Sequence, residues 1–360
     1  MLVYVFCVRR RSSRLTNKGG KDMKRNSILT LIFVLCMMVI ITPQASDGAT
    51  MKVKHAITVN MDDSGGLAAA TMRDNISKWS NGKMELQIFP GSQLGGMREH
   101  YEACQSGAIE TVYVAASAAS KFVPEIGVLD LPFLFPTDYD KAWKVIDGDL
   151  TKILSEKLAK QNFILLGIAP YGYKSLHTSS KQIKSLNDIK GLKIRIMPSK
   201  TLELTYKAWA ANPTPVEFSE LYVALQQKVV DGGENGLSVI KAQKFNEVQQ
   251  YLTVSKHGLF MGLFVANKKW FDKLPEEERN IIVKAAKTNI AQQRKFVAEE
   301  DEKIIKFLGE NGMTVYRLNT EETSEFQKAS LPVHEDFAAI SSGNKQVLEA
   351  VNKTKKALGY

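Results

Sequence analysis

The sequence predicts an α/β protein of two lobes, each a mixed sheet flanked by helices, with a long helix bridging the lobes. Three observations predict this fold class. Strand-like and helix-like segments alternate from residue 51 onward, and the alternation restarts after residue 191, which is typical of layered α/β domains. Residues 275–309 form a periodic stretch without internal Pro or Gly. At 1.5 Å per residue such a helix spans roughly 50 Å, which is enough to bridge two small lobes.

The first lobe is expected to begin with five alternating segments. Residues 51–59, 84–89 and 108–114 are predicted strands because apolar and β-favouring residues dominate them. Helices are predicted at 67–79 and 97–105; the first ends at the stop signal Asn81-Gly82. A short apolar strand follows at 163–169, and the polar stretch 171–184 is the predicted first crossing between lobes.

The second lobe is expected to contain a strand at 192–197, a helix that runs through Trp209, and a helix over 217–228. Residues 258–266 form a strand that could serve either lobe or the hinge; a strand at 313–316 and two terminal helices complete the chain. The predicted division is a leader at 1–49, a first lobe of 50–172 plus 258–298, and a second lobe of 173–257 plus 299–360.

The N-terminal segment has the pattern of a secretory signal peptide. Residues 28–41 are almost continuously apolar, basic residues precede them, and small residues follow. Fourteen residues are too few to cross a bilayer, which takes roughly 20. The basic stretch before Met23 does not fit a signal peptide, so Met23 is an alternative start. Cys36 does not favour lipoprotein anchoring, because small residues do not precede it.

Charge and cysteine content bear on two possible features, a nucleic-acid partner and an internal disulfide. The net charge is +10, but residues 1–49 hold 8 of the 48 Lys and Arg and 2 of the 38 Asp and Glu, so removing them leaves +4. This balance does not indicate a nucleic-acid partner. Only Cys104 remains beyond the leader, which excludes an internal disulfide, and its helical context favours a core cysteine over a reactive thiol.

No local motif indicates an enzyme, a metal or a cofactor. The five histidines are scattered, and neither a nucleophile elbow, a phosphate-binding loop nor a dinucleotide fingerprint is present. The glycine-rich segment 231–236 lacks the Lys-Ser/Thr of a phosphate loop. Paired carboxylates of the glycosidase kind stay open, since such pairs form in space.

Arg195 is the principal candidate for ligand binding. In the segment 191–198 (GLKIRIMP) it shares one strand face with Lys193 and Met197, while two isoleucines take the other. Ligands of open α/β folds bind at the carboxyl ends of strands, where a guanidinium could hold a carboxylate through two hydrogen bonds. The alternative is a surface arginine on an edge strand.

Several long segments resemble one receptor family at the same spacing. They are SNGKMELQIFPGSQLGG (80–96), IKSLNDIKGLKIRIMPS (183–199), NPTPVEFSELYVALQQKVVDGGEN (212–235), FNEVQQYLTVSKH (245–257) and KLPEEERN (273–280). They resemble the solute receptors of tripartite ATP-independent periplasmic (TRAP) transporters, the dicarboxylate- and sialate-receptor family. The resemblance covers nearly the whole chain after the leader.

The resemblance implies a type II periplasmic binding protein that is not an enzyme. Such a receptor is periplasmic and monomeric, closes around a small organic acid, and delivers it to large and small membrane permease subunits. By resemblance, Arg195 pairs with the ligand carboxylate, Asn235 hydrogen-bonds the ligand, and Phe218 packs against it. An ABC-type or sensory receptor, or an exported α/β hydrolase, is the alternative.

Departures from the family pattern concern the ligand. Lys174 stands where the family carries a second ligand-binding arginine, and a lysine cannot make the same two-pronged contact. The glycines at 233 and 236 replace Gln and Pro, which is expected to loosen the loop around Asn235. Val114 and Ala115 replace polar ligand-binding groups, which suggests a smaller or less polar solute. The remaining residues predicted to line the site are Thr58 and Met97.

Overall fold

The computed structural model describes residues 50–360. The predicted leader, its signal peptide and the alternative start lie outside the described residues. The strands are β1 (Met51–Ile57), β2 (Met84–Phe89), β3 (Thr111–Ala115), β4 (Phe163–Thr178), β5 (Lys193–Ile196), β6 (Asn212–Pro215), β7 (Gly232–Gly236), β8 (Tyr251–Val254), β9 (Leu259–Asn267) and β10 (Thr314–Arg317).

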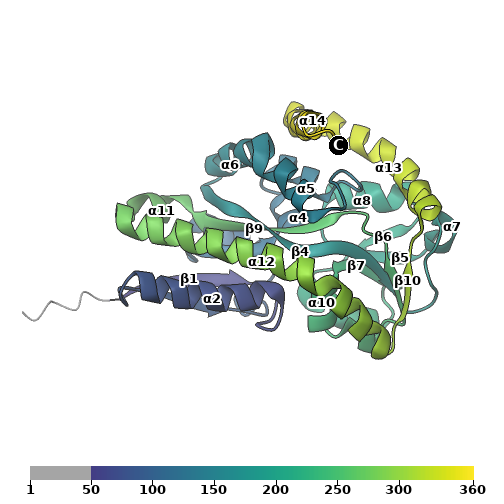
Figure 1. Ribbon diagram of the computed structural model, residues 1–360, viewed down its shortest axis with the longest axis horizontal. Coiled ribbons are helices and arrows are strands. Elements are labelled where there is room, and N and C mark those ends of the chain that lie inside the picture. Colours follow the sequence, from purple (N-terminus) through teal and green to yellow (C-terminus); the bar gives the residue numbers. More distant parts are fainter. Residues whose placement is uncertain (1–49) are drawn as a thin grey trace, which may run out of the picture. The chain divides into compact units, whose positions relative to one another are not determined.

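Helices cover both sides of these strands (Figure 1). The α-helices are α2 (Ser64–Trp79), α3 (Met97–Ser106), α4 (Ala116–Ala119), α5 (Tyr139–Val145), α6 (Thr151–Lys160), α7 (Leu186–Ile189), α8 (Lys200–Ala208), α9 (Leu221–Gln226), α10 (Leu237–Ala242), α11 (Lys268–Lys273), α12 (Glu276–Glu310), α13 (Thr320–Ile340) and α14 (Ser342–Ala357). Shorter turns are η1 (Pro124–Asp130), η2 (Ile146–Leu150), η3 (Phe218–Glu220) and η4 (Phe245–Glu247).

The strands form one hydrogen-bonded path in the order β2-β1-β3-β9-β4-β7-β5-β6, with β8 and β10 attached beside β4. Strands β1, β2 and β3 are parallel, β9 is antiparallel to β3 and β4, and β5 is parallel to both β6 and β7. The predicted mixed α/β class is confirmed.

Strand β4 lies in the middle of this path and belongs to both of its halves. It pairs with β9 from Phe163 to Tyr173, and with β7 from Lys174 to Thr178. The sequence predicted that the strand stops near Ala169, because the residues beyond it are polar. That prediction was wrong: the polar side chains of this continuation are buried, and Lys174 and His177 find partners within the structure.

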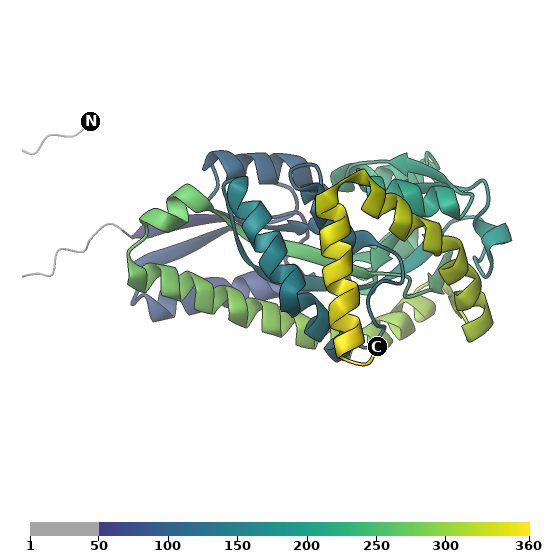
Figure 2. The same ribbon diagram turned by 90° about the horizontal axis from the view of Figure 1, so that it is seen from above.

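The predicted long helix is confirmed as α12, which packs on α2, β4, α10 and β10 and so touches elements of both halves of the path. It begins after Pro275 with three consecutive glutamates in its first turn, where negative charge favours the helix dipole. The terminal helix α14 packs on η1, η2 and α5, as the view from above illustrates (Figure 2). Among residues 50–360, no helix is both long and apolar enough to span a bilayer.

Candidate functional site

Strand β7 sends alternate side chains to opposite faces of the sheet. Asn235 lies directly opposite Ser175 of β4, and Gly233 lies opposite both His177 of β4 and Arg195 of β5. These residues therefore share one face, called here the arginine face. Glu234 points the other way, to the face that it shares with Lys174, called here the lysine face.

The arginine face carries buried polar atoms that the protein leaves unsatisfied. Arg195 is 1% exposed, and neither of its terminal nitrogens has a hydrogen-bond partner in the described part of the chain. The same holds for Asn235 Nδ2 and Ser175 Oγ. A buried charge without a partner costs several kcal/mol, so this cluster is the strongest indication of a site for an anionic ligand.

The guanidinium of Arg195 is held in place from one side only. Its Nε donates to the Val216 carbonyl at 2.9 Å, which fixes the plane and leaves Nη1 and Nη2 for a ligand. Burial lowers the pKa of Arg195 to about 10, an effect that Glu234 and Glu217 partly offset, so the group stays charged at neutral pH. The edge-strand alternative was wrong, because β5 lies between β7 and β6.

The sequence suggested that Gly233 and Gly236 loosen a loop around Asn235, but they do not. Both lie in strand β7, and a Cβ at Gly236 would come within 2.0 Å of the Tyr171 carbonyl oxygen. A Cβ at Gly233 would lie 3.2 Å from the His177 ring and 3.7 Å from Arg195 Cβ. Because the two glycines have no side chains, the Tyr171 carbonyl can lie close to β7, and the His177 ring and the Arg195 side chain can approach each other over it.

The lysine face, in contrast, is fully paired. Lys174 Nζ donates to Glu234 at 2.8 Å and to Asp130 at 3.4 Å. Glu234 also accepts from the Tyr206 phenol at 2.7 Å and lies 2.8 Å from His257 Nε2. Burial opposes both charges, but the partners outweigh it, so the pKa of Lys174 is raised and that of Glu234 is lowered.

Lys174 is thus placed among carboxylates of the protein itself. Its neighbour Asp130 also accepts from Ser117 at 2.8 Å and from Ser199 at 3.1 Å, and so joins α4, η1, β4 and the start of α8. Whether Lys174 also contacts a ligand stays a prediction. Its partner Glu234 was missed because the pairing spans 60 positions in the chain.

The other predicted site residues lie at the first strands. Thr58 follows β1, while Val114 and Ala115 end β3; these parallel strands are neighbours, so all three lie at one sheet edge. Met97 opens α3. All four are buried, as is Phe218 two residues beyond Val216. Strand register joins Arg195 and Asn235 to the arginine face. Phe218 follows Val216, whose carbonyl holds Arg195.

An aromatic cluster that the sequence reasoning missed joins β3, β4 and β9. Tyr171 stacks on Tyr113 and meets Phe260 at a tilt, with ring centroids 4.9 and 4.8 Å away. A Cβ at Gly262 would lie 2.5 Å from the Tyr113 ring, so only glycine lets the rings cover this strand. Strand alternation could not have placed Tyr171, because the β4–β9 register shifts between Pro170 and Gly172.

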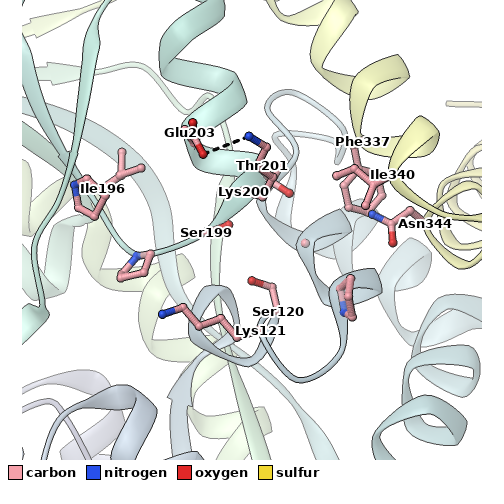
Figure 3. A pocket seen from close by; sticks show the side chains of 14 residues that line it. Ser120, Lys121, Ile196, Ser199, Lys200, Thr201, Glu203, Phe337, Ile340 and Asn344 are labelled. Carbon is pink, nitrogen blue, oxygen red and sulfur yellow. Dashed lines mark hydrogen bonds and ion pairs between the residues drawn. The ribbon is translucent and has the colours of Figure 1, made fainter.

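A separate pocket of about 440 Å³ opens at the carboxyl end of β5 (Figure 3). Ser120 and Lys121 line one side, and α8 with the end of α13 lines the other. Arg195 does not line it, and Lys200 is paired with Glu203. Among its lining residues, only Asn344 has a buried polar atom without a partner in the described chain, the amide Nδ2. The pocket therefore lacks the buried, unpaired guanidinium that marks the arginine face. Residues 50–360 contain no cluster of three or more His, Cys, Asp or Glu suited to a metal ion.

Comparisons with known proteins agree on one family. The chain matches bacterial extracellular solute-binding proteins, family 7, over residues 55–340. A solute-binding protein of Verminephrobacter eiseniae strain EF01-2 is 35% identical over 293 residues, which are 81% of this chain and 86% of that protein.

Two solved structures are similar over almost their whole length. The sugar acid binding protein of Advenella mimigardefordensis, in complex with galactonate, is 35% identical with a TM-score of 0.81, covering 85% of this chain and 99% of that one. A TRAP periplasmic solute binding protein from Sulfurospirillum deleyianum, with bound succinate, is 33% identical with a TM-score of 0.80, covering 86% and 100%.

The fold and an unsatisfied buried arginine define a solute receptor, and the chain belongs to family 7 of the bacterial extracellular solute-binding proteins. The resemblance to TRAP receptors is confirmed. The expectation of a receptor in place of an enzyme is confirmed by this membership.

Proposed function

We propose that this receptor captures a small organic acid by closing two lobes around it, with Arg195 clamping the ligand carboxylate. The observation that carries the proposal is the buried guanidinium whose two terminal nitrogens lack partners among residues 50–360. A carboxylate accepts two parallel N–H bonds from such a fork. Asn235 and Ser175, opposite each other in the strands, add polar contacts.

The ligands of the similar solved structures support this chemistry. Galactonate and succinate differ in size and hydroxylation but share a carboxylate. The lobes of the proposal are residues 50–172 plus 258–298 and residues 173–257 plus 299–360, with β4 as a crossing. Phe218, Tyr171 and the first-lobe residues Thr58, Met97, Val114 and Ala115 exclude water from the closed cleft.

The loaded receptor then delivers the acid to the membrane permease subunits of a TRAP transporter. Export through the leader at residues 1–49 places it in the periplasm, where it acts as a monomer. Ligand binding shifts the receptor toward the closed form only by as much as the ligand binds the closed form more tightly than the open form.

Calorimetric titration of the purified receptor with organic acids tests the clamp. Arg195→Ala is expected to weaken binding of every acid by at least about 30-fold, because a buried charge pair loses 2–5 kcal/mol when one partner is truncated. Its folding stability is expected to be retained or to rise, since an unpaired buried charge is removed. The matched control is Lys193→Ala, on the same strand but exposed. Unchanged affinity in Arg195→Ala contradicts the proposal.

A further inference from the structure

His177 lies on the arginine face between two side-chain amides. Its Nδ1 lies 3.1 Å from Gln249 Oε1, and its Nε2 lies 3.1 Å from Asn235 Oδ1. Both ring nitrogens therefore face oxygen atoms, and the ring is fully buried. A neutral imidazole has one donor and one acceptor nitrogen, so it can satisfy only one of these oxygens.

The orientation of Gln249 decides which nitrogen carries the proton. Gln249 is 1% exposed, and its Nε2 donates to the Val248 carbonyl at 2.9 Å. Turning this amide would set its oxygen against that carbonyl oxygen, so Oε1 stays toward His177. Nδ1 is consequently the protonated nitrogen, and Nε2 is the acceptor.

A doubly protonated ring would satisfy both oxygens, but its surroundings oppose it. Burial lowers the pKa of His177, and the charge of Arg195, which flanks the ring across Gly233, lowers it further. Hydrogen bonds from the ring to the oxygens of Gln249 and Asn235, together with the charge of Glu234, only partly offset this. Two buried cations side by side are costly when no carboxylate of the described chain contacts the terminal nitrogens of Arg195 directly. The neutral ring then requires a donor from Asn235.

We propose that His177 turns the Asn235 amide so that Nδ2 donates to the ring and Oδ1 faces the ligand, which makes the site selective for acids that carry a hydroxyl group. A half-turn of the amide keeps its shape and exchanges its two ends. The position of Asn235 Nδ2, which has no partner within the described chain, then holds an acceptor oxygen. This inference rests on the proposed carboxylate clamp and deepens it.

In this arrangement two residues bind two different groups of the ligand. Arg195 takes the carboxylate, and Asn235 Oδ1 accepts from a ligand O–H. An acid without a hydroxyl leaves this buried oxygen unsatisfied, and such a loss costs about 1–3 kcal/mol, or roughly 5- to 150-fold in affinity. A site built to bond a hydroxyl rejects the analogue that lacks it.

Calorimetry with matched acids tests the selectivity. The probes are succinate against L- and D-malate, and butyrate against erythronate. The hydroxylated acid of at least one pair is expected to bind at least about 5-fold more tightly. His177→Gln is expected to lower this ratio to within about 3-fold of unity while acids still bind, because a glutamine amide can donate or accept and frees Asn235. His55→Gln, at another buried histidine, is the control and is expected to keep the ratio.

Equal affinities within both pairs of acids, or an unchanged affinity ratio in His177→Gln, would overturn the proposed hydroxyl selectivity. Neither result would contradict the binding of the carboxylate by Arg195. The clamp itself fails if no acid binds or if Arg195→Ala binds as before. Nitrogen-15 NMR of the histidine rings tests the tautomer independently of any ligand, with His177→Gln assigning the signal. A neutral ring protonated at Nδ1 is expected; a doubly protonated ring or a proton at Nε2 overturns the inference.

Discussion

Two buried cations stand on opposite faces of the sheet, Lys174 on β4 and Arg195 on β5 with β7 between them, and their surroundings differ. Lys174 is 2% exposed and touches two carboxylates, whereas Arg195 is 1% exposed and its terminal nitrogens touch none in the described chain. Burying a charge is tolerable when partners are built in. The paired charges of the lysine face therefore stabilise the fold. The unpaired charge of the arginine face lowers the free energy of unfolding of the ligand-free receptor, and a bound ligand restores it.

The largest expected effect comes from breaking the paired face. Lys174→Met leaves Glu234 and Asp130 buried without their cation and is expected to lower the free energy of unfolding by about 3–5 kcal/mol. Urea denaturation of the ligand-free receptor measures it. The comparison fails if Arg195→Ala destabilises the protein as much as Lys174→Met does.

A side chain at Gly236 should also be costly, because the added Cβ meets the backbone oxygen of Tyr171 at 2.0 Å. Backbone cannot move aside as a flexible side chain can. Gly236→Ala is expected to lower the melting temperature, with a loss of about 1–3 kcal/mol. A variant as stable as the parent would show that β7 and β4 can separate at this position.

Two buried carboxylates extend the comparison. Glu234 has the Lys174 cation beside it and a lowered pKa, whereas burial raises the pKa of Asp63 to about 6, despite the hydrogen bond from the Gly65 N–H. The folded protein then binds the Asp63 proton more tightly than the unfolded chain does, so this group's stabilisation is present below about pH 4 and is lost as pH rises toward 6.

Asp63→Asn keeps a helix-capping oxygen and removes this titration. At pH 7 it is expected to be more stable than the parent by about 1–2 kcal/mol, and the difference should shrink toward pH 4. Denaturant midpoints across this pH range measure it. A pH-independent difference between the two proteins would contradict a raised pKa at Asp63.

The smallest effect on stability is expected at Gly233, where the added Cβ meets only the His177 ring and the Arg195 stem. Gly233→Ala should cost less than about 1 kcal/mol, but it should weaken acid binding because it displaces both groups. Denaturation and calorimetry of one preparation separate the two quantities. Intact binding would mean that the closeness of these side chains is not needed.

Much of the fold could be predicted from local pattern. The helix after Pro275 lacks breakers for more than thirty residues, so its length was evident. The crossing strand was not, because buried polar residues such as Lys174 and His177 look like a surface segment until their partners are known.

The site divides in the same way. Arg195 could be predicted as a candidate from its place at a strand end and from the resemblance. Its lack of hydrogen-bond partners could not, because that depends on which residues from distant segments pack around it. Glu234 adjoins Asn235 in sequence, yet their opposite orientations follow from strand pairing, which local sequence does not fix. The role of His177 required the positions of two amides from distant segments.

The buried Cys104 has a practical consequence. Its side chain is fully covered, and burial raises the pKa of its thiol, so it offers little thiolate to a labelling reagent. Residues 50–360 contain no other cysteine. A cysteine introduced at an exposed position near the crossing strand would therefore take a fluorophore at one place only, and the receptor could be converted into an optical sensor for its own solute without first removing the native thiol.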